Sequence, residues 1–145
     1  FEASNISVGR GTDRPFLWFG APWMKAEKIA KKLSKAGLKG VKFSAMKLTP
    51  SKDVYEGKAC EGINIEVTDK SAVRALDIFA HAVYLLKKYN GEDFELKPVE
   101  IRKMTGSSGL YNMLEAGAKP ADIIAAFEKD NAGFKAGAAK FLLYK

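Results

Sequence analysis

The most regular hydrophobic pattern in the chain lies in residues 70–89, where apolar side chains recur at three- and four-residue spacing. This period predicts a helix with one buried stripe. The predicted stripe consists of Val73, Leu76, Phe79, Ala80, Val83 and Leu86. The opposite face carries Arg74, Asp77, His81 and Lys88. The spacing pairs His81 with Asp77 on a solvated face, which argues against a catalytic histidine. Asp69 precedes the helix where an N-cap belongs.

Two segments have the period of β-strands. Residues 62–68 alternate most cleanly, with isoleucine and valine on one face and polar side chains on the other. The apolar face would hold Ile63, Ile65 and Val67, and the polar face Asn64 and Glu66. Residues 41–48 predict a second strand. Residues 49–61 between them contain proline, aspartate and glycine, and we expect a loop there.

A second amphipathic helix is predicted over residues 23–36. Pro22 suits the helix entry and Gly37 suits its end. The apolar face carries Ala26, Ile29, Ala30, Leu33 and Ala36, and lysines occupy the other face. Trp23 either packs under this helix or lines a cleft in which it stacks on a sugar; we favour packing.

The last third of the chain gives weaker signals. Residues 94–97 predict a short strand ended by Pro98, and residues 99–104 are ambiguous. Pro120 is expected to open the last helix. Its apolar positions keep helical phase to the C-terminus and are Ile123, Phe127, Phe134, Ala138 and Phe141. Two glycines, at 133 and 137, either weaken that helix or allow close packing.

A short helix is also expected between these segments. Ser107 or Ser108 can cap it and Gly117 can close it. Its apolar side chains are Leu110, Met113 and Leu114. The whole order of elements predicts an α/β (α+β) fold class, with a small mixed sheet packed by several helices in a single domain.

Composition agrees with one globular domain. The 145 residues are 47% hydrophobic and 28% charged, enough for a core and outside the disordered range. No apolar run reaches membrane-spanning length. Cys60 is the one cysteine and His81 the one histidine, so an internal disulfide is excluded and neither a metal site nor a cofactor is expected. Cys60 is predicted to be a small buried residue rather than a nucleophile.

The net charge of +7 is local. Residues 25–58 contain ten lysines and three acidic residues, and the basic and acidic residues elsewhere cancel. The segment has no arginine and few aromatic residues, which argues against nucleic-acid binding. We expect these lysines to form a solvated face, and the alternative is that they contact an anionic polymer or surface.

The first sixteen residues interleave apolar and hydrogen-bonding side chains. Gly9 and Gly11 flank Arg10, and glycine permits positive φ and the close approach of a ligand. The guanidinium is a rigid fork suited to a carboxylate or a phosphate. The Gly-Lys-Ser/Thr of a phosphate-binding loop does not follow. The segment is therefore either a polar surface loop or a binding loop.

The run FEASNISVGRGTDRPF, followed by FGAPW at residues 19–23, resembles a family of bacterial peptidoglycan exo-β-N-acetylmuramidases (NamZ-like), long catalogued as a domain of unknown function. Ala3 and Ser4 stand where the family pattern has Gly-Thr. Further matches follow in order at Thr49-Pro50, Gly57, Cys60-x-Gly62, Val67-Thr68-Asp69 and Thr105-Gly106-Ser107-Ser108. The resemblance therefore covers the whole chain.

The resemblance implies that residues 1–145, which begin inside a motif, are the C-terminal half of a two-part enzyme. A Rossmann-like half would precede them and carry the main catalytic carboxylate, so this part alone is expected to be inactive. The whole enzyme would be an exported, periplasmic glycoside hydrolase that releases N-acetylmuramic acid from the non-reducing end of peptidoglycan fragments, with this part lining the substrate cleft. Its expected partners are that sugar and the missing half, without nucleic acid. The alternative is a non-enzymatic binding module for a wall glycan or another anionic partner.

The resemblance also suggests which side chains meet the sugar. Arg10 would bind the lactyl carboxylate that distinguishes muramic acid. Glu2 would orient a hydroxyl, pair with an arginine, or act as a second carboxylate. Hydrogen bonds to the sugar are assigned to Asn5, Ser7 and Thr12, and Tyr55 lies in a loop that forms a cleft wall in the family. We expect the residues of the opening segment to converge on a solvent-reachable hollow; the catalytic residues are unknown.

Overall fold

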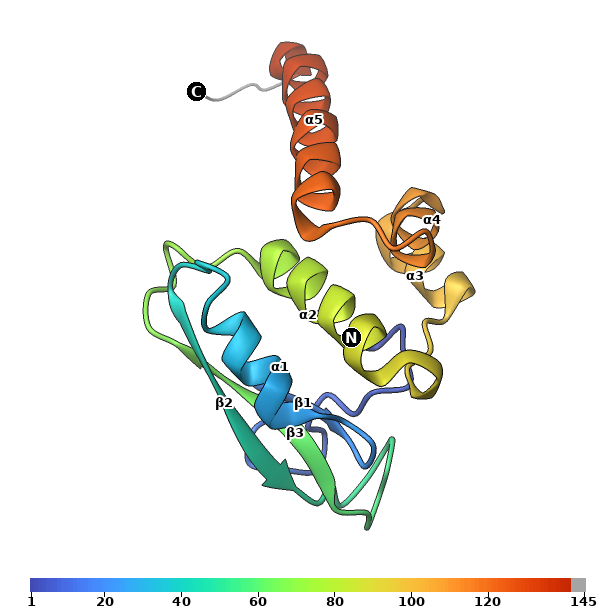
Figure 1. Ribbon diagram of the computed structural model, residues 1–145. Coiled ribbons are helices and arrows are strands. Elements are labelled where there is room, and N and C mark those ends of the chain that lie inside the picture. Colours follow the sequence, from blue (N-terminus) through green and yellow to red (C-terminus); the bar gives the residue numbers. More distant parts are fainter. Residues whose placement is uncertain (142–145) are drawn as a thin grey trace.

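The structure is a computed structural model that describes residues 1–141 (Figure 1). Within these residues a three-stranded sheet is packed by five α-helices, which confirms a single small α/β domain. The strands are β1 (Trp18–Ala21), β2 (Val41–Leu48) and β3 (Cys60–Val67). The α-helices are α1 (Ala26–Leu33), α2 (Ala75–Asn90), α3 (Pro98–Thr105), α4 (Gly109–Glu115) and α5 (Pro120–Ala138). Two 3₁₀ turns, η1 (Gly91–Asp93) and η2 (Ala139–Phe141), complete the described elements.

The sheet has the order β1-β3-β2, and both pairings are antiparallel rather than mixed. Both predicted strands are confirmed. The strand β1 was not predicted, because all four of its residues are buried and a strand buried on both faces shows no alternation. One consequence concerns Asn64, which was placed on the polar face of its strand and is nevertheless buried. Trp18 covers that face, and its indole nitrogen donates a hydrogen bond to the carbonyl of Met46 at 3.0 Å.

The helix α1 confirms its predicted face. Ala26, Ile29, Ala30 and Leu33 are all buried, and the α1 lysines are exposed. The helix is shorter than residues 23–36 at both ends. The segment from Ser34 to Gly37 continues as turns, and Gly37 takes φ +73° at their end.

The helix α2 begins at Ala75, five residues later than predicted. Asp69 does not cap it. Its carboxylate instead accepts hydrogen bonds from the amide and hydroxyl of Ser71, which close a separate turn and hold the pKa of the Asp69 carboxyl below its usual range. Since α1 and the sheet lie on one side of α2 and α5 on another (Figure 1), its buried surface is wider than one stripe. Of the predicted stripe, Ala80, Val83 and Leu86 are buried as expected, whereas Val73, Leu76 and Phe79 are only half-buried. The buried residues outside the predicted stripe are Ile78, Ala82 and Leu85.

The predicted strand at residues 94–97 is reduced to one bridge, between Leu96 and Ser4 of the opening segment. Pro98 begins α3 instead of only ending a strand, because proline fits the first helical position, where no amide donor is needed. The short helix expected after Ser108 is α4, with Leu110 and Leu114 buried.

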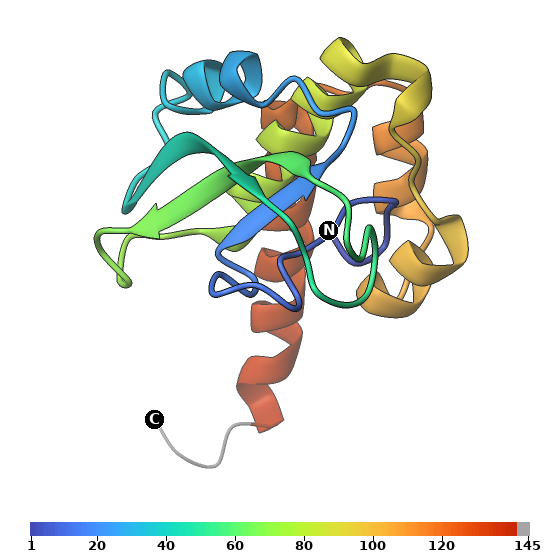
Figure 2. The same cartoon turned by 90° about the horizontal axis from the view of Figure 1, so that it is seen from below.

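The helix α5 starts at Pro120 as predicted, but only its first turns are packed. Ile123 is fully buried, whereas Phe134 is 75% exposed. Figures 1 and 2 show α5 projecting away from the rest of the domain. A Cβ added at Gly133 or Gly137 would meet no atom within 4 Å, so these glycines do not serve close packing in this structure. The α-helix ends at Ala138 and the 3₁₀ turn η2 follows, so the helix is shorter than expected within the described residues, and its expected continuation past residue 141 lies outside them.

No helix within residues 1–141 has the length and hydrophobicity needed to cross a membrane.

Candidate functional site

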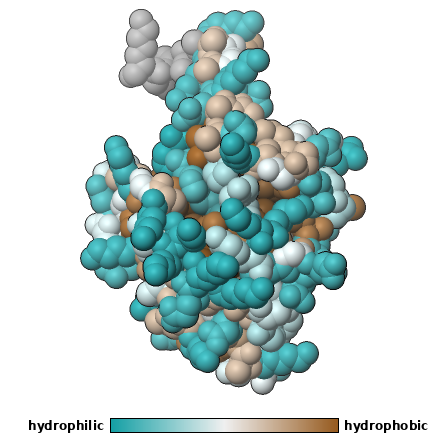
Figure 3. Space-filling model, in the orientation of Figure 1, coloured by the Kyte–Doolittle hydropathy of each residue, from teal (hydrophilic) through white to brown (hydrophobic). Residues whose placement is uncertain are grey.

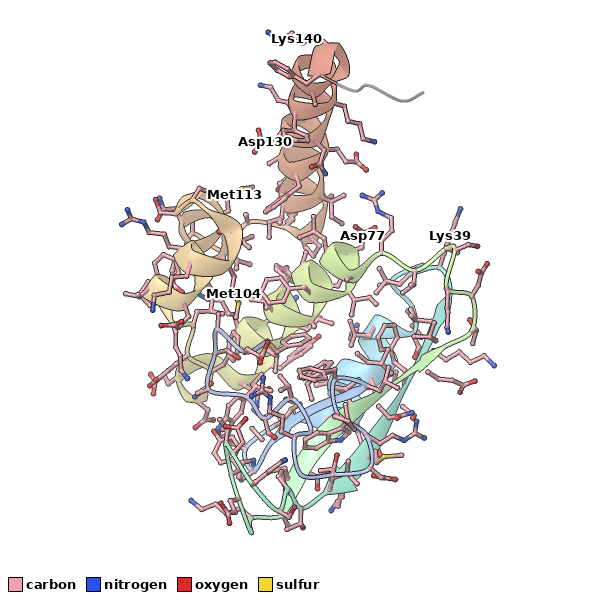
Figure 4. All side chains as sticks on the ribbon, turned by 180° about the vertical axis from the view of Figure 1, so that it is seen from behind. Lys39, Asp77, Met104, Met113, Asp130 and Lys140 are labelled. Carbon is pink, nitrogen blue, oxygen red and sulfur yellow. The ribbon has the colours of Figure 1, made fainter. Side chains whose placement is uncertain are left out.

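The opening segment is anchored to the sheet by its apolar residues and its backbone. Ile6 and Val8 are buried, and the Phe1 ring stacks on Phe19 with centroids 4.2 Å apart. Ser7 and Gly20 exchange two backbone hydrogen bonds of 2.9 Å, so the segment pairs with β1 through a single antiparallel bridge. Figure 4 shows this segment lying across the strands on the side turned away from the viewer in Figure 1. The polar residues between these anchors therefore have fixed positions.

Arg10 is presented by a turn that needs both flanking glycines. Gly9 and Gly11 each have φ +79°, a conformation that is strained for other residues. A Cβ at Gly9 would lie 2.6 Å from the Arg14 carbonyl oxygen, and one at Gly11 would lie 2.6 Å from the Lys52 amide nitrogen. The two glycines thus serve the turn and its contact with the next loop.

That loop, residues 49–59, is fastened to the turn. The amide and hydroxyl of Ser51 both donate to the Gly11 carbonyl, at 3.0 and 2.8 Å. The carbonyl of the buried Pro50 accepts from the Gly57 amide at 2.8 Å and closes the loop. As a result, Asp53 faces a residue more than forty positions earlier in the chain.

Arg10 lies between two carboxylates. Its Nη2 donates to Glu2 Oε1, and its Nε lies 3.7 Å from Asp53 Oδ2. The guanidinium carbon is 5.5 Å from the centroid of the Phe16 ring, within cation–π range. All three charged side chains are between 43% and 45% exposed. The cluster of Glu2, Arg10 and Asp53 is therefore fixed by mutual contacts and still open to a ligand.

Backbone strain gathers at the same place. The non-glycine residues with positive φ in residues 1–141 are Phe16 at 62°, Asp53 at 71° and Tyr55 at 64°. Two of them contact Arg10, and the third is two residues from Asp53. Such conformations cost on the order of 1–3 kcal/mol each and concentrate at functional sites. The strain thus marks this cluster independently of the sequence motif.

Three other predicted site residues do not join the cluster. Asn5 bridges to residues 93–95, donating to the Asp93 carbonyl at 2.8 Å and accepting from the Glu95 amide at 3.0 Å. Ser7 is buried. Thr12 donates to the Gly9 carbonyl at 2.7 Å and accepts from the Arg14 amide at 3.0 Å. The expected convergence on one hollow is therefore wrong for these three, whereas Glu2 and Arg10 do meet.

Tyr55 links the loop to the entry of α1. Its hydroxyl accepts from Trp23 Nε1 at 3.0 Å, and Asn90 donates to the Trp23 carbonyl at 2.8 Å. Trp23 is partly buried against the core, which agrees with the packing interpretation. A substrate-binding role for Tyr55, as for the other assigned residues, stays a prediction.

Asp53 was not among the predicted site residues. The residue carried a signal, because it is an acid in a lysine-rich loop that contains a matched Thr49-Pro50 motif. Its position beside Arg10 depends on the hydrogen bonds of Ser51, which no periodicity encodes.

The remaining reactive side chains lie outside the cluster. His81 Nδ1 is 2.8 Å from the backbone carbonyl of Asp77, so its partner is not the carboxylate as predicted. That carboxylate lies 3.5 Å from Arg74 instead. Cys60 is buried as predicted, and burial raises the pKa of its thiol, which disfavours the nucleophilic thiolate. Within residues 1–141, no three His, Cys, Asp or Glu side chains are arranged to hold a metal ion.

Comparison with known proteins gives consistent matches. The family model described as exo-beta-N-acetylmuramidase NamZ, C-terminal, matches residues 1–144. A curated relative, the peptidoglycan beta-N-acetylmuramidase NamZ of Bacillus subtilis (strain 168), is 32% identical over 144 residues, which are 99% of this chain and 35% of the relative. The chain thus spans about a third of the length of that relative.

Solved structures agree on the fold. Two crystal structures of DUF1343 family proteins from Bacteroides fragilis NCTC 9343 match with TM-scores of 0.63 and 0.64 at 22% identity. They cover 97% and 100% of this chain, which in turn covers 38% of each. The family model, which matches almost the whole chain, confirms the resemblance noted from the motifs: the chain belongs to the family of NamZ C-terminal domains.

Proposed function

We propose that this domain is the C-terminal part of an exo-acting glycoside hydrolase that releases N-acetylmuramic acid from the non-reducing end of peptidoglycan fragments. In this proposal the preceding part of the polypeptide is Rossmann-like and supplies the principal catalytic carboxylate, and the present domain lines the cleft. The enzyme acts outside the cytoplasm, in the periplasm, where its substrate lies. The observation that carries the proposal is the open Glu2–Arg10–Asp53 cluster in a domain of the muramidase family.

Arg10 has the chemistry for the distinguishing group of the substrate. Muramic acid carries a lactyl carboxylate, and a guanidinium binds carboxylates through paired donors. A guanidinium has five N–H donors, and its hydrogen bond to Glu2 uses one of them. A ligand carboxylate can therefore be bound beside Glu2, while Asp53 keeps the guanidinium oriented.

Glu2 has a second role in this proposal. One of its oxygens accepts from Arg10, and the other can accept from a sugar hydroxyl. Charge-assisted hydrogen bonds of this kind contribute about 1.5–3 kcal/mol. Glu2 is thus a residue that orients the sugar, and the principal catalytic carboxylate lies in the preceding part of the enzyme.

The experiment that tests this function analyses products of the full-length polypeptide that contains this domain. Wall fragments ending in N-acetylmuramic acid at the non-reducing end are incubated with it, and released sugars are identified by mass spectrometry. Free N-acetylmuramic acid is expected from these fragments and not from matched fragments capped by N-acetylglucosamine. No release, or release from internal positions, would contradict the proposal. The 145 residues alone are expected to give no product.

A second candidate function is a non-enzymatic module for a wall glycan or another anionic partner. It is favoured by the exposed lysines of α1, Lys28, Lys31 and Lys32, on a face that Figure 3 shows to be largely hydrophilic. Binding through these lysines would weaken steeply with added salt. Binding that resists salt and is competed by free N-acetylmuramic acid would favour the cleft instead.

A further inference from the structure

An apolar hollow of about 430 Å³ opens beside the candidate site. It lies between the end of the opening segment, the end of β3 and the start of α2, and its lining is apolar throughout. Three of its side chains are unusually exposed for their size: Phe16 at 60%, Leu17 at 41% and Val67 at 38%.

A second hollow, of about 290 Å³, continues from the first. The two share Phe1, Ala75 and Phe79. The second extends to Met104 at the end of α3, which is labelled in Figure 4 and is 59% exposed. We call the two hollows together the apolar trough. Four large apolar side chains exposed along one continuous depression exceed the scattered exposure that is normal for a soluble surface.

The backbone holds Phe16 in this exposed position. Its φ of 62° is strained for an aromatic residue, and its amide donates to the buried Val8 carbonyl at 2.8 Å. The strained backbone costs free energy, and so does the exposure of a phenyl ring to water. A partner that covers the ring removes the second of these costs. The strain and the exposure therefore point to an occupant.

We infer that the apolar trough is the surface on which the rest of the longer polypeptide packs. This inference rests on the proposed function, in which this domain is one part of a larger enzyme. The chain covers 35% of its curated relative and 38% of each solved structure, so a polypeptide of such length has enough further chain to cover the trough.

The location of the trough gives the packing a consequence for the site. Phe16 lines the trough and also lies beneath the Arg10 guanidinium, 5.5 Å from ring centroid to carbon. A domain seated in the trough would therefore meet the Glu2–Arg10–Asp53 cluster at its edge. Clefts between domains are preferred positions for ligand sites, and the cluster becomes one wall of such a cleft.

Hydroxyl-radical footprinting of the full-length polypeptide tests the trough. The oxidation rates of Phe16 and Met104 are measured in the native state and in urea, by mass spectrometry. If the two side chains are covered, their oxidation in the native state should be at least about tenfold slower than in urea. Rates within about twofold of the unfolded chain, as expected for rings this exposed, would overturn the inference. Protection that disappears on dilution would also overturn it, because it would indicate a second copy as the occupant.

Two variants sharpen the result. Val67→Lys places a charge in the trough and should raise the oxidation rate of Phe16 severalfold, whereas Phe134→Ser on the projecting part of α5 should leave it unchanged. If Val67→Lys does not fold, the oxidation rates of Phe16 and Met104 in the natural sequence still show whether the trough is covered. The oxidation rate can be measured without any turnover of substrate. A protected Phe16 in a protein without muramidase activity would contradict the proposed function but not the packing on the trough. An exposed Phe16 in an active enzyme would contradict the packing but not the proposed function.

Discussion

At the scale of single residues, the candidate site depends on glycines and strained positions more than on its polar side chains. Gly9 and Gly11 allow the turn that exposes Arg10. Asp53 reaches Arg10 from a position with φ +71°. Asn5 and Thr12, which look like ligand-binding residues in the sequence, hold the backbone instead. The chemistry left for a ligand is therefore concentrated at Arg10 and its two carboxylates.

The indole of Trp18 also requires a glycine, at position 62, for a purely structural reason. A Cβ at Gly62 would lie 2.2 Å from a Trp18 ring atom. Gly62→Ala is therefore expected to lower the free energy of unfolding by at least about 2 kcal/mol, since the buried ring cannot move aside. Denaturant titration measures this change.

The matched control for that prediction is Gly133→Ala. This glycine lies in α5 with open space around it, and alanine is favoured over glycine in a helix by about 0.5–1 kcal/mol. The same titration should show a small stabilisation. Equal effects of the two substitutions would contradict the placement of Trp18 over Gly62.

At the scale of elements, the helix α5 is attached at one end. Ile123 is fully buried, and Arg74 at the start of α2 pairs with Glu128 at 2.9 Å. Beyond this point Phe134 of the helix and Phe141 of the following turn η2 are exposed. Helices gain most of their stability from tertiary packing, so the first turns of α5 carry its contribution to the fold.

A pair of truncations tests this attachment. Ile123→Ala should lower the free energy of unfolding by about 2–4 kcal/mol, because it leaves a cavity in the core. Phe134→Ala should change the free energy of unfolding by less than about 0.5 kcal/mol, because the exposed ring makes few contacts that the substitution could remove. The measurement is again denaturant unfolding of both variants. A large loss from Phe134→Ala would show that the outer half of α5 is packed.

At the scale of the whole molecule, the sequence predicted what periodicity encodes. The alternation of Ile63, Ile65 and Val67 predicted β3, and the lysine-backed apolar face of residues 26–33 predicted α1. Together with the late but correct α2, these elements gave the fold class.

What the sequence could not predict depends on contacts between distant segments. Asn64 is buried because Trp18 crosses its face of the sheet. Asp53 meets Arg10 because Ser51 fastens one loop to another. The apolar phase of α5 predicted the helix but not its projection, since phase does not say whether a partner is present. Residue types alone therefore identified Glu2 and Arg10 but not Asp53, the third member of the cluster.

The central claim is that Arg10 recognises the lactyl carboxylate of muramic acid, and one comparison tests it most directly. The full-length enzyme and its Arg10→Ala variant are assayed on two substrates that differ only in that carboxylate, with Arg102→Ala, an exposed α3 arginine, as the control. Loss of a charge-assisted hydrogen bond predicts a fall in kcat/KM of about 10- to 100-fold on the muramic-acid substrate. A much smaller fall is expected on the substrate without the carboxylate, where only the support of Glu2 is lost, and no change in the control. An equal fall on both substrates, or no fall on either, would contradict the account.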